Sequence, residues 1–75
     1  MNNQKTDINQ KPDWRYSPEW ARYTAMDADG NWWWYQDKPR PSIKDMLWES
    51  SGKTERVQIF MSETALWLST LEEMK

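Results

Sequence analysis

Residues 22–36 read RYTAMDADGNWWWYQ, and the turn within this stretch governs the fold that the sequence predicts. Residues 27–31, DADGN, separate two runs of β-prone residues, which is the signal of a hairpin turn. A three-residue loop ending at Gly30 matches a type I turn followed by a residue with positive φ. Glycine suits that position because it has no Cβ to clash. Asp27 and Asp29 can accept hydrogen bonds from nearby amides and stabilise the turn.

This loop also sets the register of the predicted hairpin, whose strands run roughly over residues 22–26 and 32–36. Asp27 would face Asn31, and the pairing would continue from Met26–Trp32 to Tyr23–Tyr35. Side chains alternate between the two faces of a strand. One face would therefore carry Thr24, Met26, Trp32 and Trp34, and the other Tyr23, Ala25, Trp33 and Tyr35.

The length and composition indicate one small domain held together by aromatic side chains. The chain has 75 residues, with seven Trp, three Tyr and one Phe. It contains no Cys and no His, which excludes disulfides and thiolate or imidazole metal ligands. Since each aromatic side chain can bury about 150–250 Å², these residues are the expected source of the core.

The rest of the chain predicts a small α+β domain with a three-stranded antiparallel sheet, and an all-β fold is the alternative. Residues 1–13 are polar and are expected to form a disordered tail, which leaves residues 14–75 as the single domain. Residues 55–61 alternate as a third strand. Residues 62–74 predict a C-terminal helix with Ser62 as its N-cap and a stripe of Trp67, Leu71 and Met74. Residues 42–50 are ambiguous between one helical turn and an irregular loop.

Charge and hydropathy indicate which partners and which cellular location to expect for the protein. The formal net charge is −2, from 12 acidic and 10 basic residues, whereas a nucleic-acid-binding domain usually has a strongly basic face. Nucleic acid is therefore an unlikely partner. No apolar run approaches the ~20 residues that span a bilayer, and residues 1–13 contain no apolar signal segment. We expect a cytoplasmic protein without membrane contacts.

Catalysis and metal binding are not expected either. Without His or Cys, the commonest acid–base and nucleophilic arrangements are absent. Asp27 and Asp29 suggest a calcium loop, but an EF-hand needs Gly at position six and Glu at position twelve. Counted from Asp27, those positions hold Trp32 and Lys38. We predict no enzyme activity, no cofactor and no metal.

The predicted architecture leaves one aromatic face open. A single helix covers only one face of a three-stranded sheet, and a large exposed aromatic patch usually marks an interaction site. The candidate partner-binding residues are Tyr23, Trp33, Tyr35, Arg22 and Arg40. The alternative is that Trp14, Trp48 or a second subunit covers this face.

Several further motifs carry a resemblance to a known family. Residues 18–21 (PEWA), residues 25–32 (AMDADGNW), Trp34-Tyr35 and Pro39 resemble small phage- and prophage-encoded proteins with a Trp-rich DxDG hairpin. Those proteins are similar further on, with a Trp after the proline segment, a strand and a late Trp-x-x-Ser/Thr-Leu element. Here Trp48 and residues 67–71 (WLSTL) fit that pattern. The resemblance covers about residues 18–71 and implies a phage or prophage origin.

The resemblance and the open aromatic face together suggest a function. Short phage accessory proteins often inhibit a host enzyme or defence system. We therefore expect a non-catalytic, anti-defence type of inhibitor that binds a host protein in the cytoplasm of the host cell. The alternatives are a module that stacks single-stranded nucleic acid or glycan on Trp and Tyr, and a structural homo-oligomer such as a homodimer.

Overall fold

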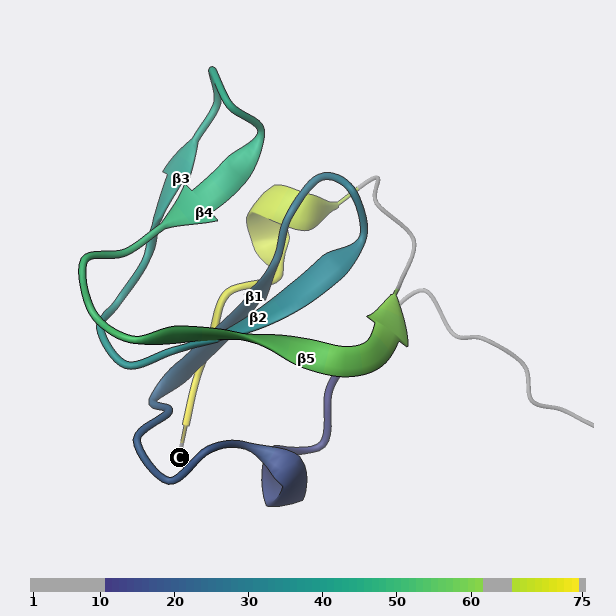
Figure 1. Cartoon of the computed structure of the whole chain (residues 1–75). Coiled ribbons are helices and arrows are strands. Elements are labelled where there is room, and N and C mark those ends of the chain that lie inside the picture. The colour runs from purple at the N-terminus through teal and green to yellow at the C-terminus, as the bar shows by residue number, and fades with distance from the viewer. Residues whose placement is uncertain (1–10, 62–65, 75) are drawn as a thin grey trace, which may run out of the picture.

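The computed structural model describes residues 11–61 and 66–74 of the chain, and within them the fold is almost entirely β (Figure 1). Six strands form two antiparallel sheets, and the helical elements are two single 3-10 turns, η1 and η2. In chain order the elements are η1 (Trp14–Tyr16), β1 (Tyr23–Met26), β2 (Asn31–Tyr35), β3 (Arg40–Ser42), β4 (Leu47–Glu49), β5 (Thr54–Met61), η2 (Trp67–Ser69) and β6 (Glu72–Glu73).

The larger sheet has the strand order β5-β2-β1-β6, and each neighbouring pair is antiparallel. β3 and β4 form a separate two-stranded hairpin that projects from one end of this sheet (Figure 1). η2 lies at the same end, and η1 lies at the opposite end (Figure 1). The fold is therefore a central β1–β2 hairpin to which every other element is added.

The structure confirms the predicted hairpin and its register. Tyr23 pairs with Tyr35, and the pairing continues to Met26 with Trp32. The turn closes through the amide of Asp27, which donates to the carbonyl of Asn31 at 2.9 Å. Gly30 has a φ of 91°, the positive value that the loop requires. Asp29 Oδ1 accepts the Asn31 amide at 2.9 Å.

The predicted α+β fold is wrong, because the described part of the C-terminal segment forms η2 and β6 instead of a helix. Residues 62–65, including the proposed N-cap Ser62, lie outside the described residues. β6 pairs with β1, and the amide of Met74 donates to the carbonyl of Arg22 at 2.8 Å. These bonds satisfy a β1 edge that would otherwise carry unpaired polar groups, which is a strong constraint on a sheet. Helix propensity is weak by comparison.

Residues 40–49 form the β3–β4 hairpin and contain no helix. β3 and β4 are joined by a four-residue turn, and the amide of Met46 donates to the carbonyl of Ser42 at 2.7 Å. Ser42 Oγ accepts the Asp45 amide at 3.2 Å, so the cap-like spacing of Ser42 and Asp45 stabilises a hairpin turn. The helical spacing of Ile43, Met46 and Leu47, which favours one helical turn in the sequence, is therefore misleading here.

Both faces of the central hairpin are covered by tryptophan. On one face the Trp14 ring lies against Trp34, with centroids 5.1 Å apart. On the other face Trp48 and Trp67 form an edge-to-face pair with centroids 6.2 Å apart. The buried core consists of Ala21, Ala25, Met26, Trp32, Trp34, Tyr35, Trp48, Val57 and Trp67.

The segment before η1 is held against the sheet from residue 11 onwards. The indole of Trp14 donates to Glu72 at 3.2 Å, and the Lys11 ammonium lies 3.7 Å from the same carboxylate. Pro12 is buried and Asp13 caps η1 by accepting the Arg15 amide. The predicted tail of residues 1–13 thus overlaps the described domain at residues 11–13, and residues 1–10 lie outside the described part.

We predict that Gly30→Ala lowers the free energy of unfolding by about 1–2 kcal/mol, because a Cβ is disfavoured at positive φ. Gly30→Asn should cost less, since asparagine enters the left-handed region more readily than alanine. Urea unfolding followed by tryptophan fluorescence measures both variants. Equal stability of Gly30→Ala and the parent chain would contradict the prediction.

Candidate functional site

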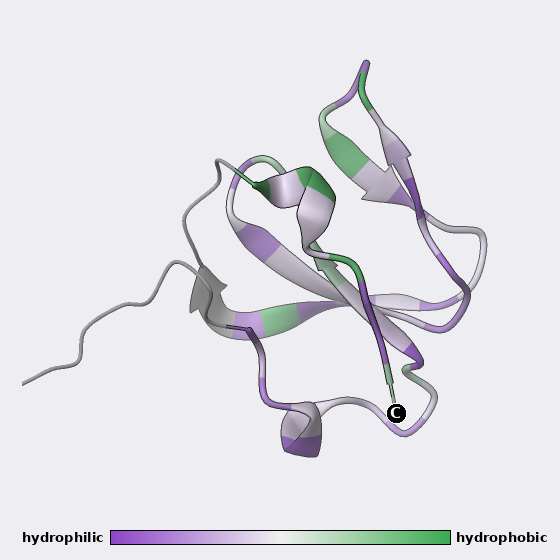
Figure 2. Cartoon of the chain, turned by 180° about the vertical axis from the view of Figure 1, so that it is seen from behind, coloured by the Kyte–Doolittle hydropathy of each residue, from purple (hydrophilic) through white to green (hydrophobic). Residues whose placement is uncertain are grey.

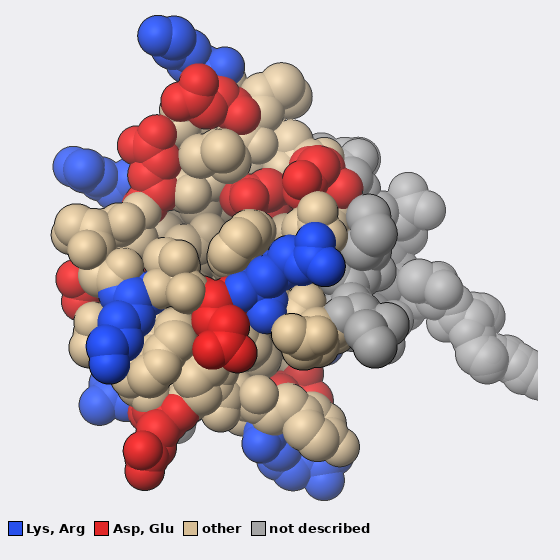
Figure 3. Space-filling view, in the orientation of Figure 1, with Lys and Arg blue, Asp and Glu red and all other residues tan. Residues whose placement is uncertain are grey.

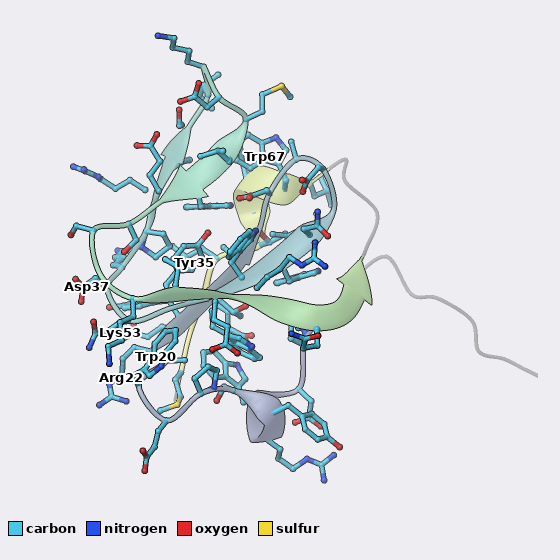
Figure 4. All side chains as sticks on the ribbon, viewed as in Figure 1. Trp20, Arg22, Tyr35, Asp37, Lys53 and Trp67 are labelled. Carbon is cyan, nitrogen blue, oxygen red and sulfur yellow. The ribbon has the colours of Figure 1, made fainter. Side chains whose placement is uncertain are left out.

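The aromatic residues proposed as a binding face lie mostly in the interior. Tyr35 is 3% exposed, and Tyr23 and Trp33 are half-buried against the core. Figure 4 shows Tyr35 within the body of the domain, between the strands. The alternative stated from the sequence, in which Trp48 folds back over this face, describes the packing better. Tyr35 therefore has almost no surface to offer to a partner.

Asp27 is the polar centre of this covered face. Its side chain is 9% exposed, and Oδ1 accepts the amide of Trp48 at 2.8 Å. The indole of Trp48 in turn donates to the carbonyl of Met26 at 3.0 Å, and the indole of Trp33 also hydrogen-bonds to the Asp27 carboxylate. The residue expected only to stabilise a turn therefore also anchors β4 to the central hairpin.

Burial changes the acidity of two groups here. Desolvation raises the pKa of Asp27 above its usual value, and the hydrogen bond from the Trp48 amide opposes that rise. Burial, together with the nearby negative charge of Asp27, raises the pKa of Tyr35. Burial thus favours the neutral phenol of Tyr35, whereas Asp27 also lines a hollow between two turns that is described below.

The two arginines of the predicted site are exposed but stand apart from these aromatics. Arg22 lies beside Trp20 at the end of the molecule away from Trp67 (Figure 4). Its side chain is exposed, while its backbone joins Tyr35 and Met74 through hydrogen bonds of 2.8 Å. Arg40 is exposed on β3 and lines a polar hollow with Lys38 and Glu49. The structure does not combine the five predicted residues into one surface.

A different apolar surface is exposed at the end of the molecule that carries the β3–β4 turn and η2. We call it the apolar end and define it by Ile43, Met46, Leu66 and Leu68, which are 65%, 56%, 60% and 48% exposed. Figure 2 shows hydrophobic segments of η2 and of the β3–β4 hairpin at the same end. The two elements are joined beneath this surface by the Trp48–Trp67 ring contact.

Met46 has an unusual backbone conformation within the apolar end. Its φ is 59°, which makes it the one non-glycine residue with positive φ in the described part of the chain. This conformation costs an ordinary L-residue about 1–2 kcal/mol. Its carbonyl accepts the amide of Ala28 at 3.2 Å, so the β3–β4 turn is fastened to the β1–β2 turn. Glycine would satisfy the backbone better, and the exposed methionine side chain has no evident role in folding.

A hollow of about 360 Å³ lies between these two turns. It is lined by Asp27, Ala28, Asp29, Asp45, Met46 and Leu47. The lining combines carboxylates with apolar groups and includes no Lys or Arg. Figure 3 shows acidic and basic residues interspersed over the molecule, with carboxylates over the part where the β1–β2 turn lies.

A second hollow, of about 460 Å³, lies between the segment before η1 and β5. Trp34 and Val57 contribute its apolar lining, and Lys11, Asp13, Glu55 and Arg56 contribute charges of both signs. Tyr16, which is 78% exposed, lines the same hollow. The mixed charges of this hollow favour no particular class of ligand.

Two further kinds of site, a metal centre and a membrane-spanning helix, are absent from the described residues. Across residues 11–61 and 66–74, no group of three or more potential ligands is placed to hold a metal ion. None of the helical elements in the described part of the chain is long and apolar enough to cross a membrane.

The sequence contained a weak signal for the apolar end. The helical spacing of Ile43 and Met46 favours one helical turn, and the apolar stripe of the helix predicted over residues 62–74 is widened by Leu68. Because the first segment forms a tight turn and the second a 3-10 turn, these side chains point outwards instead of into a core.

Comparisons with protein-family models, curated proteins and solved structures found no match.

We predict that Asp27→Ala lowers the free energy of unfolding by about 1–3 kcal/mol, because it leaves the Trp48 amide without its buried acceptor. Glu19→Ala, at an exposed position, is the control and should change stability by less than about 0.5 kcal/mol. Chemical denaturation measures both variants. A loss for Asp27→Ala as small as that of the control would show that the Asp27–Trp48 bond is dispensable.

We predict that Met46→Gly leaves the free energy of unfolding unchanged or raises it by up to about 1 kcal/mol, because the positive φ no longer opposes a Cβ. Ile43→Gly lies in the same turn at a residue without positive φ, and it should lower stability by about 0.5–1 kcal/mol. Thermal unfolding compares the two variants. A clear loss for Met46→Gly would mean that the methionine side chain supports the fold.

Proposed function

We propose that this protein is a non-catalytic accessory protein of phage type that binds and inhibits a host protein in the host cytoplasm. An anti-defence role, directed at a defence nuclease or its assembly, is the leading case. The observation that carries the proposal is the apolar end, where four large apolar side chains are 48–65% exposed on a chain of only 75 residues.

The exposure of these apolar side chains is informative because the domain is small. Small domains bury a smaller share of the surface of their unfolded chain than large domains do, and their stability is correspondingly marginal. Isolated exposed leucines are ordinary, but here four large apolar side chains lie exposed on two elements at the same end of the molecule (Figure 2). Grouped apolar side chains on a folded surface are characteristic of a protein-interaction site.

Two further observations support a binding role for the phage-type chain. The resemblance of residues 18–71 to small phage and prophage proteins points to a class in which inhibitors of host proteins are common. The buried carboxylate of Asp27 is committed to hydrogen bonds with Trp48 and Trp33. A binding role needs no reactive group, and the apolar end presents large apolar side chains, which protein interfaces bury at their centre.

The alternative functions receive less support from the geometry. A module that stacks single-stranded bases or sugars needs open aromatic faces, whereas Tyr35 is buried and Trp33 is half-buried. A homodimer would bury the apolar end against a second copy. Light scattering that shows a monomer at high protein concentration would exclude that alternative.

The test is capture of a host protein by the full-length tagged chain from bacterial lysate, read by mass spectrometry. We expect one dominant host protein, and we expect its recovery to fall about tenfold or more when Ile43→Ser and Met46→Gly are combined, because buried apolar anchors dominate interface energies. Tyr16→Ser removes an exposed aromatic residue from another surface and should leave recovery unchanged.

The captured host protein is then purified and assayed for its own activity with and without the parent chain. Loss of that activity at stoichiometric amounts would support inhibition, and the double variant should not cause it. Retention of no host protein, or equal recovery with the double variant, would overturn the proposed function at this surface.

A further inference from the structure

We infer that the apolar end, together with the adjacent acidic hollow, docks a protein segment in which a lysine or arginine stands next to a large apolar side chain. This inference rests on the proposed function and specifies the chemistry of the partner. The hollow lies directly beside the exposed side chain of Met46, which lines it, so a single segment can contact both.

The charge of the hollow selects a basic side chain. Asp27, Asp29 and Asp45 contribute three carboxylates to its lining, and no cation lines it. The recorded hydrogen bonds of Asp29 and Asp45 join them to neutral groups of Asn31 and Ser42. Neither carboxylate belongs to an ion pair within the described part of the chain, where the pairs are Lys11–Glu72 and Arg15–Asp13. Their negative charge is therefore available to a partner.

The shape of the hollow favours an organic cation over a metal ion. These carboxylates are not arranged as a metal-binding group among the described residues. Ala28, Met46 and Leu47 line the same hollow, and such groups suit the aliphatic stem of lysine or arginine, whose charged head remains near the carboxylates. An apolar neighbour on the same segment would then lie on Ile43 and Met46.

The conformation of Met46 agrees with a binding role. Methionine at an exposed turn rarely has a positive φ, and here the conformation brings no evident gain in packing. Backbone conformations of this kind concentrate at functional positions. The hydrogen bond from the Ala28 amide to the Met46 carbonyl holds the two turns together. Met46 and the aspartates of the β1–β2 turn thus line the same hollow.

The experiment selects a random displayed library of 12-residue peptides against the full-length chain, and then measures an enriched, fluorescein-labelled peptide by fluorescence anisotropy. We expect enriched peptides to carry Lys or Arg beside Leu, Ile, Met, Phe or Trp. Their Kd should rise about tenfold or more for the Asp29→Asn/Asp45→Asn double variant, since a segment seated in the hollow would cover these two exposed carboxylates, and close charge pairs across an interface couple strongly. Met46→Gly should also raise the Kd by about tenfold.

The matched control is Glu19→Gln combined with Glu55→Gln, which removes the same amount of charge from exposed positions outside the hollow. It should change the Kd by no more than about twofold, because charges beyond the Debye length are largely screened. Thermal unfolding confirms that each variant is folded. Absence of enrichment, enrichment of peptides without a basic residue, or equal effects of the control and the hollow variant would overturn the inference.

Failure of this inference is distinguishable from failure of the proposed function. If a host protein is captured through Ile43 and Met46 but binds the Asp29→Asn/Asp45→Asn variant like the parent chain, the inference falls and the function stands. If basic–apolar peptides bind through the hollow while no host protein is captured, the function falls and the docking chemistry stands.

Discussion

The hydrogen bond between the Asp27 carboxylate and the Trp48 amide, at 2.8 Å, joins the two hairpins on which this structure depends. Asp27 directly follows β1, and Trp48 lies at the centre of β4, 21 residues later. With that bond in place the Trp48 indole reaches the Met26 carbonyl and the ring meets Trp67. One face of the central hairpin is thereby closed by residues from two distant segments.

Closing both faces with tryptophan explains how a chain without cysteine can form a core. Trp14 covers one face and the Trp48–Trp67 pair covers the other. Two of these indoles have paired N–H groups, since Trp14 donates to Glu72 and Trp48 donates to the Met26 carbonyl. The elements that supply these rings are short turns and strands. Their remaining apolar side chains cannot also reach the core, and they form the apolar end.

At the candidate site, residue patterns predicted which side chains share a strand face but not which elements cover that face. Alternation along β1 and β2 placed Tyr23, Trp33 and Tyr35 on one face, and the observed register agrees with that placement. Alternation carries no information about what covers a face. Trp48 of β4 and Trp67 of η2 cover this face. The sequence did not predict these two elements, because the spacing of Ile43, Met46 and Leu68 is typical of helices. The exposed surface therefore lies on the covering elements and not on the sheet that they cover.

The sequence by itself determined the central hairpin, its turn and its pairing, because these depend on neighbouring residues: Gly30 at positive φ, the Asp29 side chain bonded to the Asn31 amide, and runs of β-prone residues on either side. Only the tertiary structure decided which secondary structure residues 66–74 adopt. There the unpaired edge of β1 and the Thr70 hydroxyl, which accepts the Met26 amide at 2.8 Å, outweighed a modest preference for helix. Long-range hydrogen bonds to an existing sheet are absent from any local pattern, and they override propensities of a few tenths of a kcal/mol per residue.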